Sequence, residues 1–578
     1  MKNIIKYISI IMVLTGVFSC EDMFEPIDQN LITSDYINSD PASAEGILLQ
    51  GYKNFYHQFG FSEAATDDAV NNQLNHAYSR MASGQMSAQF FPLSRWGNYQ
   101  PVIYVNEFIE ILDKGEIQWR EDHEIDSLFY RRLRGEALAL RAIHHMYILQ
   151  AHAGEVGGEL MGVPYVTEAI DPQSEFDLVR LSFKATIDSI SSDFDKSLEL
   201  LPFKYSNSNA YQPDDSTIDF DKWKIVMGEQ YNLRMSGEIV RALQARLALF
   251  AASPSFLDGA GDYYQKAADI AGEFVFDAFG LAIPDGHLFY NEDSDKDSKE
   301  LVWRGSIEGE SAHQEQNHFP PSANGNGQVN PTQNLIDAFP MADGYPIDNP
   351  SGKYTYDPQN PFVNRDPRLA HYIVTDGSSI GGKVIHTGVG GGIDRLDSIS
   401  GKSTRTGYYL RKLLHPDVRI NDDGSVVGQR HIIVYMRMTE LFLIFAEAAN
   451  EIGGPDHQID LGHGALFSAK QAIASVRKRS GIEQPDRYLS SIDSKEEMRK
   501  LIQNERRLEL CFEGFRFFDL RRWGLPLNVV PKGYFFDGNQ YVEVDNVEER
   551  NYPQHATYNP IPYSEVLKFS ALEQNTGW

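Results

Sequence analysis

Cysteine is scarce in this sequence, which has only two, Cys20 and Cys511, among 578 residues. Two thiols cannot build the disulfide framework on which small secreted domains depend, so the fold must rest on its hydrophobic core. Cys511 lies in the mainly apolar stretch 508–512, where a small buried hydrophobic side chain is expected rather than a nucleophile. No cysteine chemistry is therefore predicted for the folded part of the chain.

Basic residues are also few, because 52 Lys and Arg stand against 81 Asp and Glu, for a net charge of -29. Such a surface repels nucleic-acid phosphates and anionic lipid headgroups, so neither is an expected partner. Long hydrophobic runs are missing beyond the N-terminus. The longest, 441–449, contains Glu447, whereas a membrane helix needs about 20 apolar residues. Any membrane attachment is expected from lipid, not from a spanning helix.

The first twenty residues have the layout of a bacterial lipoprotein signal. A basic start is followed by an apolar run from Ile8 to Phe18, by small Ser19 and then by Cys20. We predict a signal peptide at 1–19 and lipidation of Cys20. The two acidic residues that follow resemble the tag that sends such lipoproteins to the outer face of the outer membrane. The alternative is an ordinary export signal with an incidental cysteine, because the residues before Cys20 fit the usual small-residue pattern loosely.

Helical periodicity recurs along the chain. Residues spaced by three and four, from Leu133 to Ala151, line one face of a predicted helix. Alanine recurs on the inner faces of three further predicted helices, at 242–252, 441–448 and 465–476. Small side chains there let helices approach closely, and the alternation is similar to tetratricopeptide-type helix pairs of about 34 residues.

Long irregular stretches separate these helices, notably 305–331 and 377–406, which are rich in Gly, Asn, Ser and His. Irregular segments of this length are uncommon in a compact domain unless they bind something. Strand-like runs are short and scattered, at 300–304, 383–386, 408–413 and 541–544. The predicted fold class is mainly α, a tetratricopeptide-repeat-like helical scaffold with long irregular loops and a few short β-strands.

Residues 504–524 combine opposite charges with aromatic rings. Three glutamates share one helical face and three arginines are available as partners, namely Glu505, Glu509, Glu513, Arg506, Arg516 and Arg522. Because desolvated charges are tolerated only when they are paired and hydrogen-bonded, we predict an internal ion-pair lattice near the C-terminal end. Its role is expected to be structural rather than catalytic.

The same segment closely resembles the C-terminal signature of the SusD/RagB family, the surface lipoproteins that capture nutrients beside a TonB-dependent outer-membrane transporter. Further motifs similar to the family's follow in its order, at 134–142, 162–165, 331–335, 339–340, 343–344, 365–369, 435–449, 476–481, 559–562 and 574–575. The resemblance covers nearly the whole mature chain. It departs from the family pattern at Cys511 and in the loose lipidation context.

This resemblance implies one SusD-like domain over residues 20–578, with the first repeat helices in roughly 20–230 and the ligand-facing loops and final repeats in roughly 270–578. Family members bind glycans, or in some cases peptides, and hand them to a SusC-like TonB-dependent transporter. They are not enzymes, and no cofactor or metal is implied. The resemblance therefore implies a glycan-binding protein that is lipid-anchored at the outer membrane and exposed at the cell surface.

Independent signals for catalysis are weak. The stretch 377–381 fits the pattern of a hydrolase nucleophile elbow, but that motif needs a strand before it and a helix after it. Asp293, Asp295 and Asp297 alternate like a calcium loop without its glycine and terminal glutamate. Three alternatives to glycan binding are kept: peptide capture, a surface glycoside hydrolase, and a structural lipoprotein that lids the transporter without a ligand.

Glycan recognition needs exposed aromatic rings for the C–H faces of a sugar, with amides, carboxylates or arginine for its hydroxyls. We therefore select loop or loop-edge residues that have polar neighbours. The candidate ligand-binding residues are Trp96, Asn98, Tyr290, Trp303, His313, Asn317 and Phe319. For each aromatic residue the alternative is a side chain that packs in the core, and Trp96 also fits the opening of a packed helix.

Overall fold

The computed structural model describes residues 40–169, 177–212, 217–257, 262–278, 281, 288–291, 298–462 and 464–578. The signal peptide at 1–19, Cys20 and the acidic loop 293–297 lie outside the described residues. The predictions made for them therefore stay predictions, as does the assignment of the mature chain to one domain.

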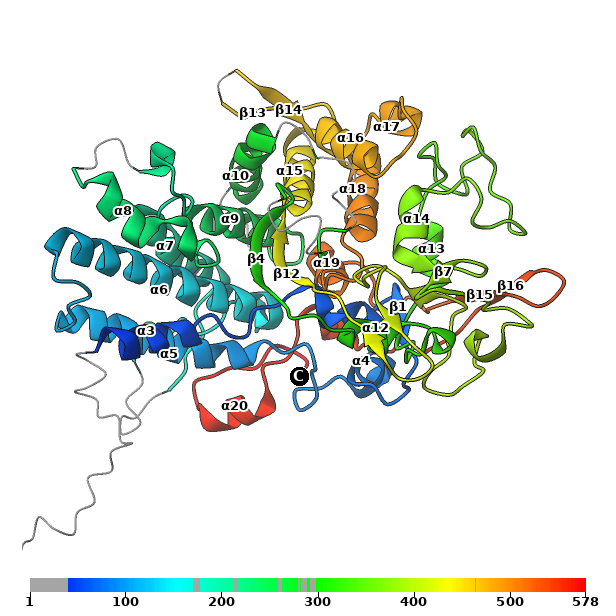
Figure 1. Ribbon diagram of the computed structural model, residues 1–578, viewed down its shortest axis with the longest axis horizontal. Helices are drawn as coiled ribbons and strands as arrows, with labels where there is room; N and C mark the ends of the chain where they lie inside the picture. Colours follow the sequence, from blue (N-terminus) through cyan, green and yellow to red (C-terminus); the bar gives the residue numbers. More distant parts are fainter. Residues whose placement is uncertain are drawn as a thin grey trace, which may run out of the picture.

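Helices that follow one another along the chain pack together and form most of the scaffold (Figure 1). Helix α6 contacts α5 and α7, α9 contacts α10, and α15 contacts α10, α16 and α18. The longer helices are α3 (Pro41–Gln50), α5 (Tyr99–Lys114), α6 (His123–His152), α7 (Phe183–Leu200), α8 (Phe220–Met227), α9 (Gly237–Ala252), α10 (Tyr263–Ala278), α15 (Met438–Gly453), α16 (Ala469–Arg479), α18 (Lys495–Glu509) and α19 (Arg516–Trp523). The shorter ones are α4 (Ala77–Arg80), α12 (His313–His318), α13 (Gln333–Ala338), α14 (Pro367–Tyr372), α17 (Arg487–Ser491) and α20 (Tyr563–Lys568).

The central helix α6 shows why the sequence predicts this scaffold. It begins after Asp122, whose carboxylate accepts hydrogen bonds from the backbone N–H groups of the first turn. The predicted inner face, from Leu133 to Ala151, is buried. In α16 the helix begins later than predicted, at Ala469, because Ser468 and Gln471 form a capping box there. The mainly helical fold class is confirmed.

Strands are short and pair two by two in antiparallel fashion. The longest pair joins β4 (Leu301–Ile307) to β12 (Ile432–Arg437), and β1 (Ala69–Asn71) pairs with β5 (Val329–Pro331). The other pairs are β2 (Gly154–Val156) with β3 (Glu159–Met161), β6 (Ile373–Val374) with β9 (Tyr409–Leu410), β7 (Ser379–Ile380) with β8 (Lys383–Val384), β10 (Arg419–Ile420) with β11 (Val426–Val427), β13 (Gln458–Asp460) with β14 (Leu466–Ser468), and β15 (Gly533–Phe536) with β16 (Tyr541–Val544). Each of the four runs predicted as strands contains or overlaps one of these.

The predicted ion-pair lattice is present, with different partners from those expected. Glu509 pairs with Arg368, Arg437 and Arg479 from three other elements. Burial raises the pKa of the Glu509 carboxyl, but these arginines outweigh burial and lower it to about 2. The nearby Arg506 instead binds Asp519. The expected pairing of the glutamates of 504–524 with the arginines of the same segment is wrong, because these glutamates bind arginine and lysine side chains from other elements.

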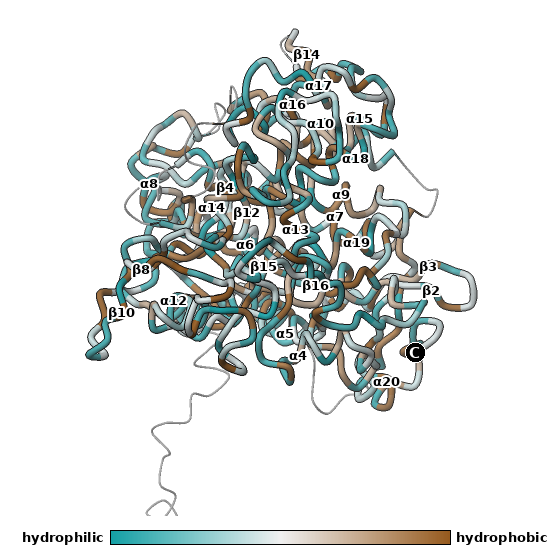
Figure 2. The backbone as a smooth tube through the Cα atoms, turned by 90° about the vertical axis from the view of Figure 1, so that its right-hand side faces the viewer, coloured by the Kyte–Doolittle hydropathy of each residue, from teal (hydrophilic) through white to brown (hydrophobic). Residues whose placement is uncertain are grey.

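The described part of the chain contains no helix that is both long and apolar enough to cross a membrane. Figure 2 shows hydrophobic and hydrophilic stretches alternating at short intervals along the backbone. Cys511 is 1% exposed, and burial raises the pKa of its thiol to about 12. It is therefore the buried small side chain that the sequence predicts.

Candidate functional site

A hollow of about 430 Å³ opens where residues 59–78 meet residues 313–329, and we call it the binding hollow. The antiparallel pair β1–β5 holds these distant segments together, with Asn71 opposite Val329. The Asn72 side-chain amide reinforces the junction by donating to the backbone carbonyls of residues 326 and 327, at 2.8 Å each. Figure 1 shows α4, α12 and β1 close together at this place.

Aromatic rings from the N-terminal segment form one wall of the binding hollow. Phe59 and Phe61 lie 6.4 Å apart between ring centroids, and His76 lies 5.1 Å from Tyr78. Phe61 joins two 3₁₀ turns and has a left-handed backbone, with φ of 46°. A non-glycine residue in that conformation costs of order 1–3 kcal/mol, which the surrounding packing must offset. Burial raises the pKa of Tyr78 to about 12, so its hydroxyl stays protonated.

Amide and imidazole groups form the opposite wall. His313 is exposed and Asn317 half-buried on α12, one turn apart, and the Asn317 amide nitrogen lies 3.3 Å from His313 Nε2. Gln328 donates to the Asn317 side-chain oxygen at 3.5 Å. Burial lowers the pKa of His318, behind this wall, to about 3. The wall is therefore polar, and the imidazole of His318 is uncharged at neutral pH.

No acidic side chain belongs to the lining of the binding hollow, among the residues that the structure describes. Hydrolysis of a glycosidic bond needs two carboxyl groups about 5–10 Å apart across the substrate. The hollow presents rings on one side and hydrogen-bonding amides on the other, and no carboxyl pair is among its described lining.

Two of the seven residues predicted to bind ligand meet at this hollow, His313 and Asn317. The prediction missed Phe59, Phe61 and Tyr78 in the opposite wall. The sequence signal for them is modest, a glycine between two phenylalanines. Their position opposite α12 depends on the β1–β5 pairing, which joins segments more than 250 residues apart.

The expected exposure of the other five candidates is wrong, because the structure buries their side chains. Trp96 is 9% exposed, Asn98 1%, Tyr290 3%, Trp303 2% and Phe319 0%. Trp303 contacts the rings of residues 55 and 435 at 4.9 and 4.6 Å, and Tyr290 donates its hydroxyl to the Leu414 carbonyl. A side chain enclosed in this way has no face to offer a sugar.

Trp96 and Asn98 are buried in the 3₁₀ turn Trp96–Asn98, which leads directly into the packed helix α5. The Trp96 ring lies 4.9 Å from Tyr99 and 5.4 Å from His152. The Asn98 amide donates to the Tyr56 hydroxyl, and its oxygen lies 2.9 Å from the ring of His144. These contacts match the alternative that a packed helix starts at Trp96.

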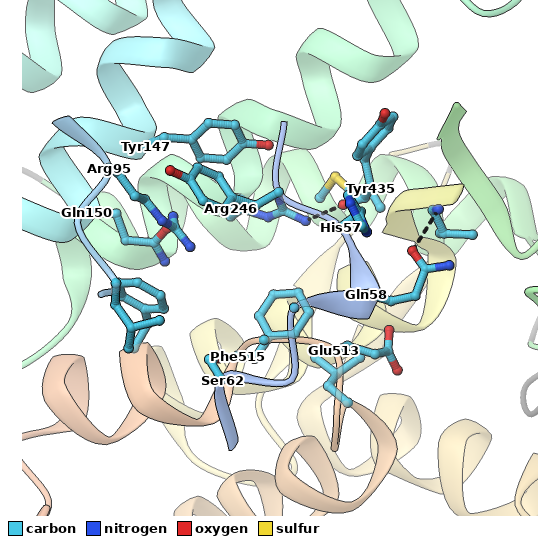
Figure 3. A pocket seen from close by; sticks show the side chains of 18 of the residues that line it. His57, Gln58, Ser62, Arg95, Tyr147, Gln150, Arg246, Tyr435, Glu513 and Phe515 are labelled. Carbon is cyan, nitrogen blue, oxygen red and sulfur yellow. Dashed lines mark hydrogen bonds between the residues drawn. The ribbon is translucent and has the colours of Figure 1, made fainter. Parts of the chain in front are cut away.

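A second, smaller cavity of about 140 Å³ adjoins the binding hollow, and we call it the arginine pocket. The two cavities share Gly60, Tyr78 and Pro92 in their linings. Figure 3 shows Arg95, Tyr147 and Gln150 on one side of this pocket, with Arg246 nearby and Phe515 across from them. Helices α6, α9 and α15 each contribute to its wall.

The nucleophile-elbow pattern at 377–381 does not have the required geometry. Its central residues form the hairpin β7–β8, so no helix follows the serines. The Ser378 hydroxyl donates to the Thr375 carbonyl at 2.8 Å. No cluster of three metal-binding side chains occurs in the described ranges.

The structure is a helical scaffold with a hollow lined by aromatic rings and by amides. The SusD family model matches residues 296–578, and a second family model, described as starch-binding and associating with the outer membrane, matches residues 26–217. The chain belongs to the SusD family. The resemblance in the sequence motifs is thereby confirmed.

Known relatives agree with this assignment. Two SusD-like proteins of Formosa agariphila are 31% identical over 122 residues and 34% identical over 98 residues. The first match covers 21% of this chain and 20% of that protein, and the second 17% and 18%. The chain is therefore aligned with about a fifth of each relative's length.

Solved structures match over almost the full length. A SusD-like protein from Bacteroides fragilis is 22% identical, with a TM-score of 0.73, and the match covers 95% of this chain and 99% of that one. A laminarin-binding SusD-like protein is 18% identical with a TM-score of 0.59, covering 93% and 100%. At these identities the matches establish the fold.

Proposed function

We propose that this chain is a cell-surface glycan-binding protein. It is anchored in the outer membrane by lipid on Cys20 and delivers oligo- or polysaccharide to a SusC-like TonB-dependent transporter. The observation that carries the proposal is the binding hollow, where rings face amides and the described lining has no acid. A sugar presents C–H groups on its faces and hydroxyls at its edge. The aromatic wall can therefore contact a face of the sugar, and the amide wall can hydrogen-bond its hydroxyls.

Relatives support the choice of ligand. The similar structures include a laminarin-binding SusD-like protein, a SusD-like carbohydrate-binding protein of Bacteroides fragilis and a surface glycan-binding protein of Bacteroides fluxus. The matching N-terminal family model is described as starch-binding and associating with the outer membrane. A glycan is therefore the first ligand class to test.

Calorimetric titration of the mature protein against a panel of oligosaccharides tests the binding function. We expect at least one glycan to bind with a Kd in the micromolar to millimolar range, and Tyr78→Ala to weaken that binding. The matched control is Tyr563→Ala, on α20, where the tyrosine is 44% exposed and away from the hollow. If no glycan binds and peptides do, the proposed function is peptide capture instead of glycan capture.

Product analysis separates binding from hydrolysis. Overnight incubation of the protein with each bound polysaccharide is expected to leave its chain length unchanged, because the described lining of the hollow supplies no acid pair. Shortened products that disappear with a hollow variant would favour a surface glycoside hydrolase.

Anchoring and delivery are tested on the native protein. The mass of the mature N-terminus is expected to correspond to a chain that begins at acylated Cys20. Detergent extracts of the outer membrane are expected to yield a complex with a TonB-dependent transporter. A non-acylated chain in the periplasm contradicts the anchor. A stable transporter complex with no glycan affinity would point to a purely structural lid.

A further inference from the structure

The arginine pocket is a continuation of the binding hollow with different chemistry. Gly60, Tyr78 and Pro92 line both cavities, so a ligand in the hollow has the pocket as its immediate neighbour. An engineered cavity of about 150 Å³ admits benzene, and the pocket measures about 140 Å³. It therefore has room for roughly one six-membered ring or a ring substituent.

Arg95 in the pocket wall is a buried cation without an acidic partner. Its side chain lies between the rings of Tyr56 and Phe518, with the guanidinium carbon 4.2 and 4.1 Å from their centroids. Arg95 is only 7% exposed. It donates to the side-chain oxygen of Gln150, and it forms no ion pair with a carboxylate of the described residues. The stacked rings compensate part of the cost of burying this charge.

The other charged groups in the wall are already paired. Arg246 binds both carboxylate oxygens of Glu440, at 2.8 and 2.6 Å. Arg437 binds Glu513 through two nitrogens, at 2.9 and 2.8 Å. These pairs neutralise their own charges, so the positive charge of Arg95 remains uncompensated in the wall.

Other buried arginines without a carboxylate partner in the described chain are hydrogen-bonded more fully. Arg365 donates to the carbonyls of residues 336, 339 and 361, and Arg521 donates to those of residues 150 and 557. The guanidinium of Arg95 has five N–H groups and makes one hydrogen bond to the described protein, the bond to Gln150. Its remaining donors are available to a ligand.

Tyr147 adds a second donor to the same wall. The residue is 3% exposed, and its hydroxyl, beside Arg246, makes no hydrogen bond of normal geometry with the described residues. Burial raises its pKa to about 12, so the hydroxyl is protonated at neutral pH. Arginine can only donate, so beside Arg246 the hydroxyl oxygen accepts and its proton is left for a ligand or a water.

We propose that the arginine pocket binds an anionic substituent, a carboxylate or a sulfate ester, on a sugar ring next to those held in the binding hollow. Arg95 donates to the anion through its free N–H groups, and the Tyr147 hydroxyl donates a further hydrogen bond. A guanidinium matches the oxygens of such anions in shape as well as in charge. This inference rests on the proposed glycan-binding function and narrows it to acidic glycans.

The net charge of -29 opposes an anionic ligand at long range. At physiological ionic strength, charges more than about 8 Å apart are largely screened at an exposed surface. Inside the pocket the charge of buried Arg95 is screened much less, so it governs the preference for charged or neutral ligands at contact.

Ligand pairs that differ only in charge test the inference directly. The probes are a uronic-acid oligosaccharide with its carboxyl-reduced form, and a sulfated oligosaccharide with its desulfated form. We expect one acidic probe to bind about tenfold more tightly than its neutral partner, as expected for a charge-assisted hydrogen bond. The pair that shows the difference identifies carboxylate or sulfate as the ligand group.

Two variants place that preference in the pocket. Arg95→Gln is expected to remove most of the preference for the acidic probe and to leave affinity for the neutral partner nearly unchanged. Because Arg95 is buried, the thermal unfolding of the Arg95→Gln variant is measured as well. Tyr147→Phe removes only the hydroxyl, which makes no hydrogen bond of normal geometry with the described residues, so the variant should fold normally and still reduce the preference severalfold. Arg120→Gln is the control, because exposed Arg120 also stacks on a ring, that of Phe129 at 4.8 Å.

The outcomes separate the two proposals. Equal binding of acidic and neutral probes, or a preference that survives in both folded variants, overturns the anion site and leaves glycan binding intact. Failure of all four probes, and of the wider glycan panel, overturns the proposed function and this inference with it.

Discussion

His313 and Asn317 lie one helical turn apart on α12, with the Asn317 amide nitrogen 3.3 Å from His313 Nε2. An amide nitrogen can only donate, so the histidine nitrogen accepts, and the pair is held in one arrangement. Both side chains face a hollow whose other wall is aromatic. Their spacing on one helix therefore orients a polar wall toward any ligand there.

The first prediction concerns this pair. Asn317→Ala removes one donor and one acceptor from the hollow and releases the ring of His313, so glycan affinity is expected to fall by about tenfold. The melting temperature should change little, because Asn317 is only half-buried. Calorimetric titration with the best ligand of the panel measures the effect. Gln316→Ala, on the exposed side of the same helix, is the control.

The second prediction concerns Trp303, which is 2% exposed and packed against Phe55 and Tyr435. Trp303→Ala leaves a large cavity and should lower the free energy of unfolding by about 3–5 kcal/mol. Leu74→Ala, at a residue 65% exposed, should stay within about 0.5 kcal/mol of wild type. Urea unfolding compares the two. A small loss at Trp303 would contradict its place in the core.

The sequence predicts the helical scaffold well because periodicity is a local property. The buried face of α6 and the alanines of α9 repeat every three or four residues, and this repeat is visible without knowledge of neighbours. The site is harder to predict, because its two walls come from 59–78 and 313–329. The β1–β5 pairing brings these distant segments together, and local periodicity does not reveal it.

The wrong expectation that five candidates would be exposed has a related cause. Local sequence shows that Trp96 and Trp303 have polar neighbours, but exposure depends on which element packs against each ring. The ring of Tyr435 on strand β12 lies against Trp303, and helix α6 supplies His152 beside Trp96. Polar neighbours in sequence are therefore a poor guide to exposure when the next layer of the fold comes from a distant segment.

The third prediction concerns Glu509, which is held by three arginines. Glu509→Gln leaves buried cations without their counter-charge and should cost about 3–5 kcal/mol of unfolding free energy at neutral pH. Glu543→Gln is the matched control, because its pair with Lys532 at 2.6 Å is about two-fifths exposed on each side. That pair should contribute about 1 kcal/mol or less.

The pH dependence of the Glu509 contribution follows from the direction of its pKa shift. The folded pKa is about 2, below the ordinary value of 4.5. The stabilisation is therefore fully present above pH 4.5 and is lost as the pH falls toward 2. The unfolding free energies of the wild type and of the Glu509→Gln variant should therefore converge as the pH falls from 4.5 to 2. A difference in unfolding free energy that stays constant down to pH 2 would contradict the conclusion that the ion pairs of Glu509 cause the stabilisation.

The last prediction concerns Glu63, which is fully buried with one carboxylate oxygen bound to the Gly514 N–H and the other without a hydrogen bond in the described structure. Burial raises the pKa of this carboxyl from 4.5 to about 7. A raised folded pKa means that stability is greatest below pH 4.5 and falls as the pH rises to 7, by about 3 kcal/mol. Glu63→Gln imitates the protonated form, so it should match wild type near pH 4.5 and exceed it at pH 8. Urea unfolding between pH 4.5 and pH 8 tests this prediction. If the unfolding free energies of the wild type and the variant ran parallel with pH, the raised pKa of Glu63 would be contradicted.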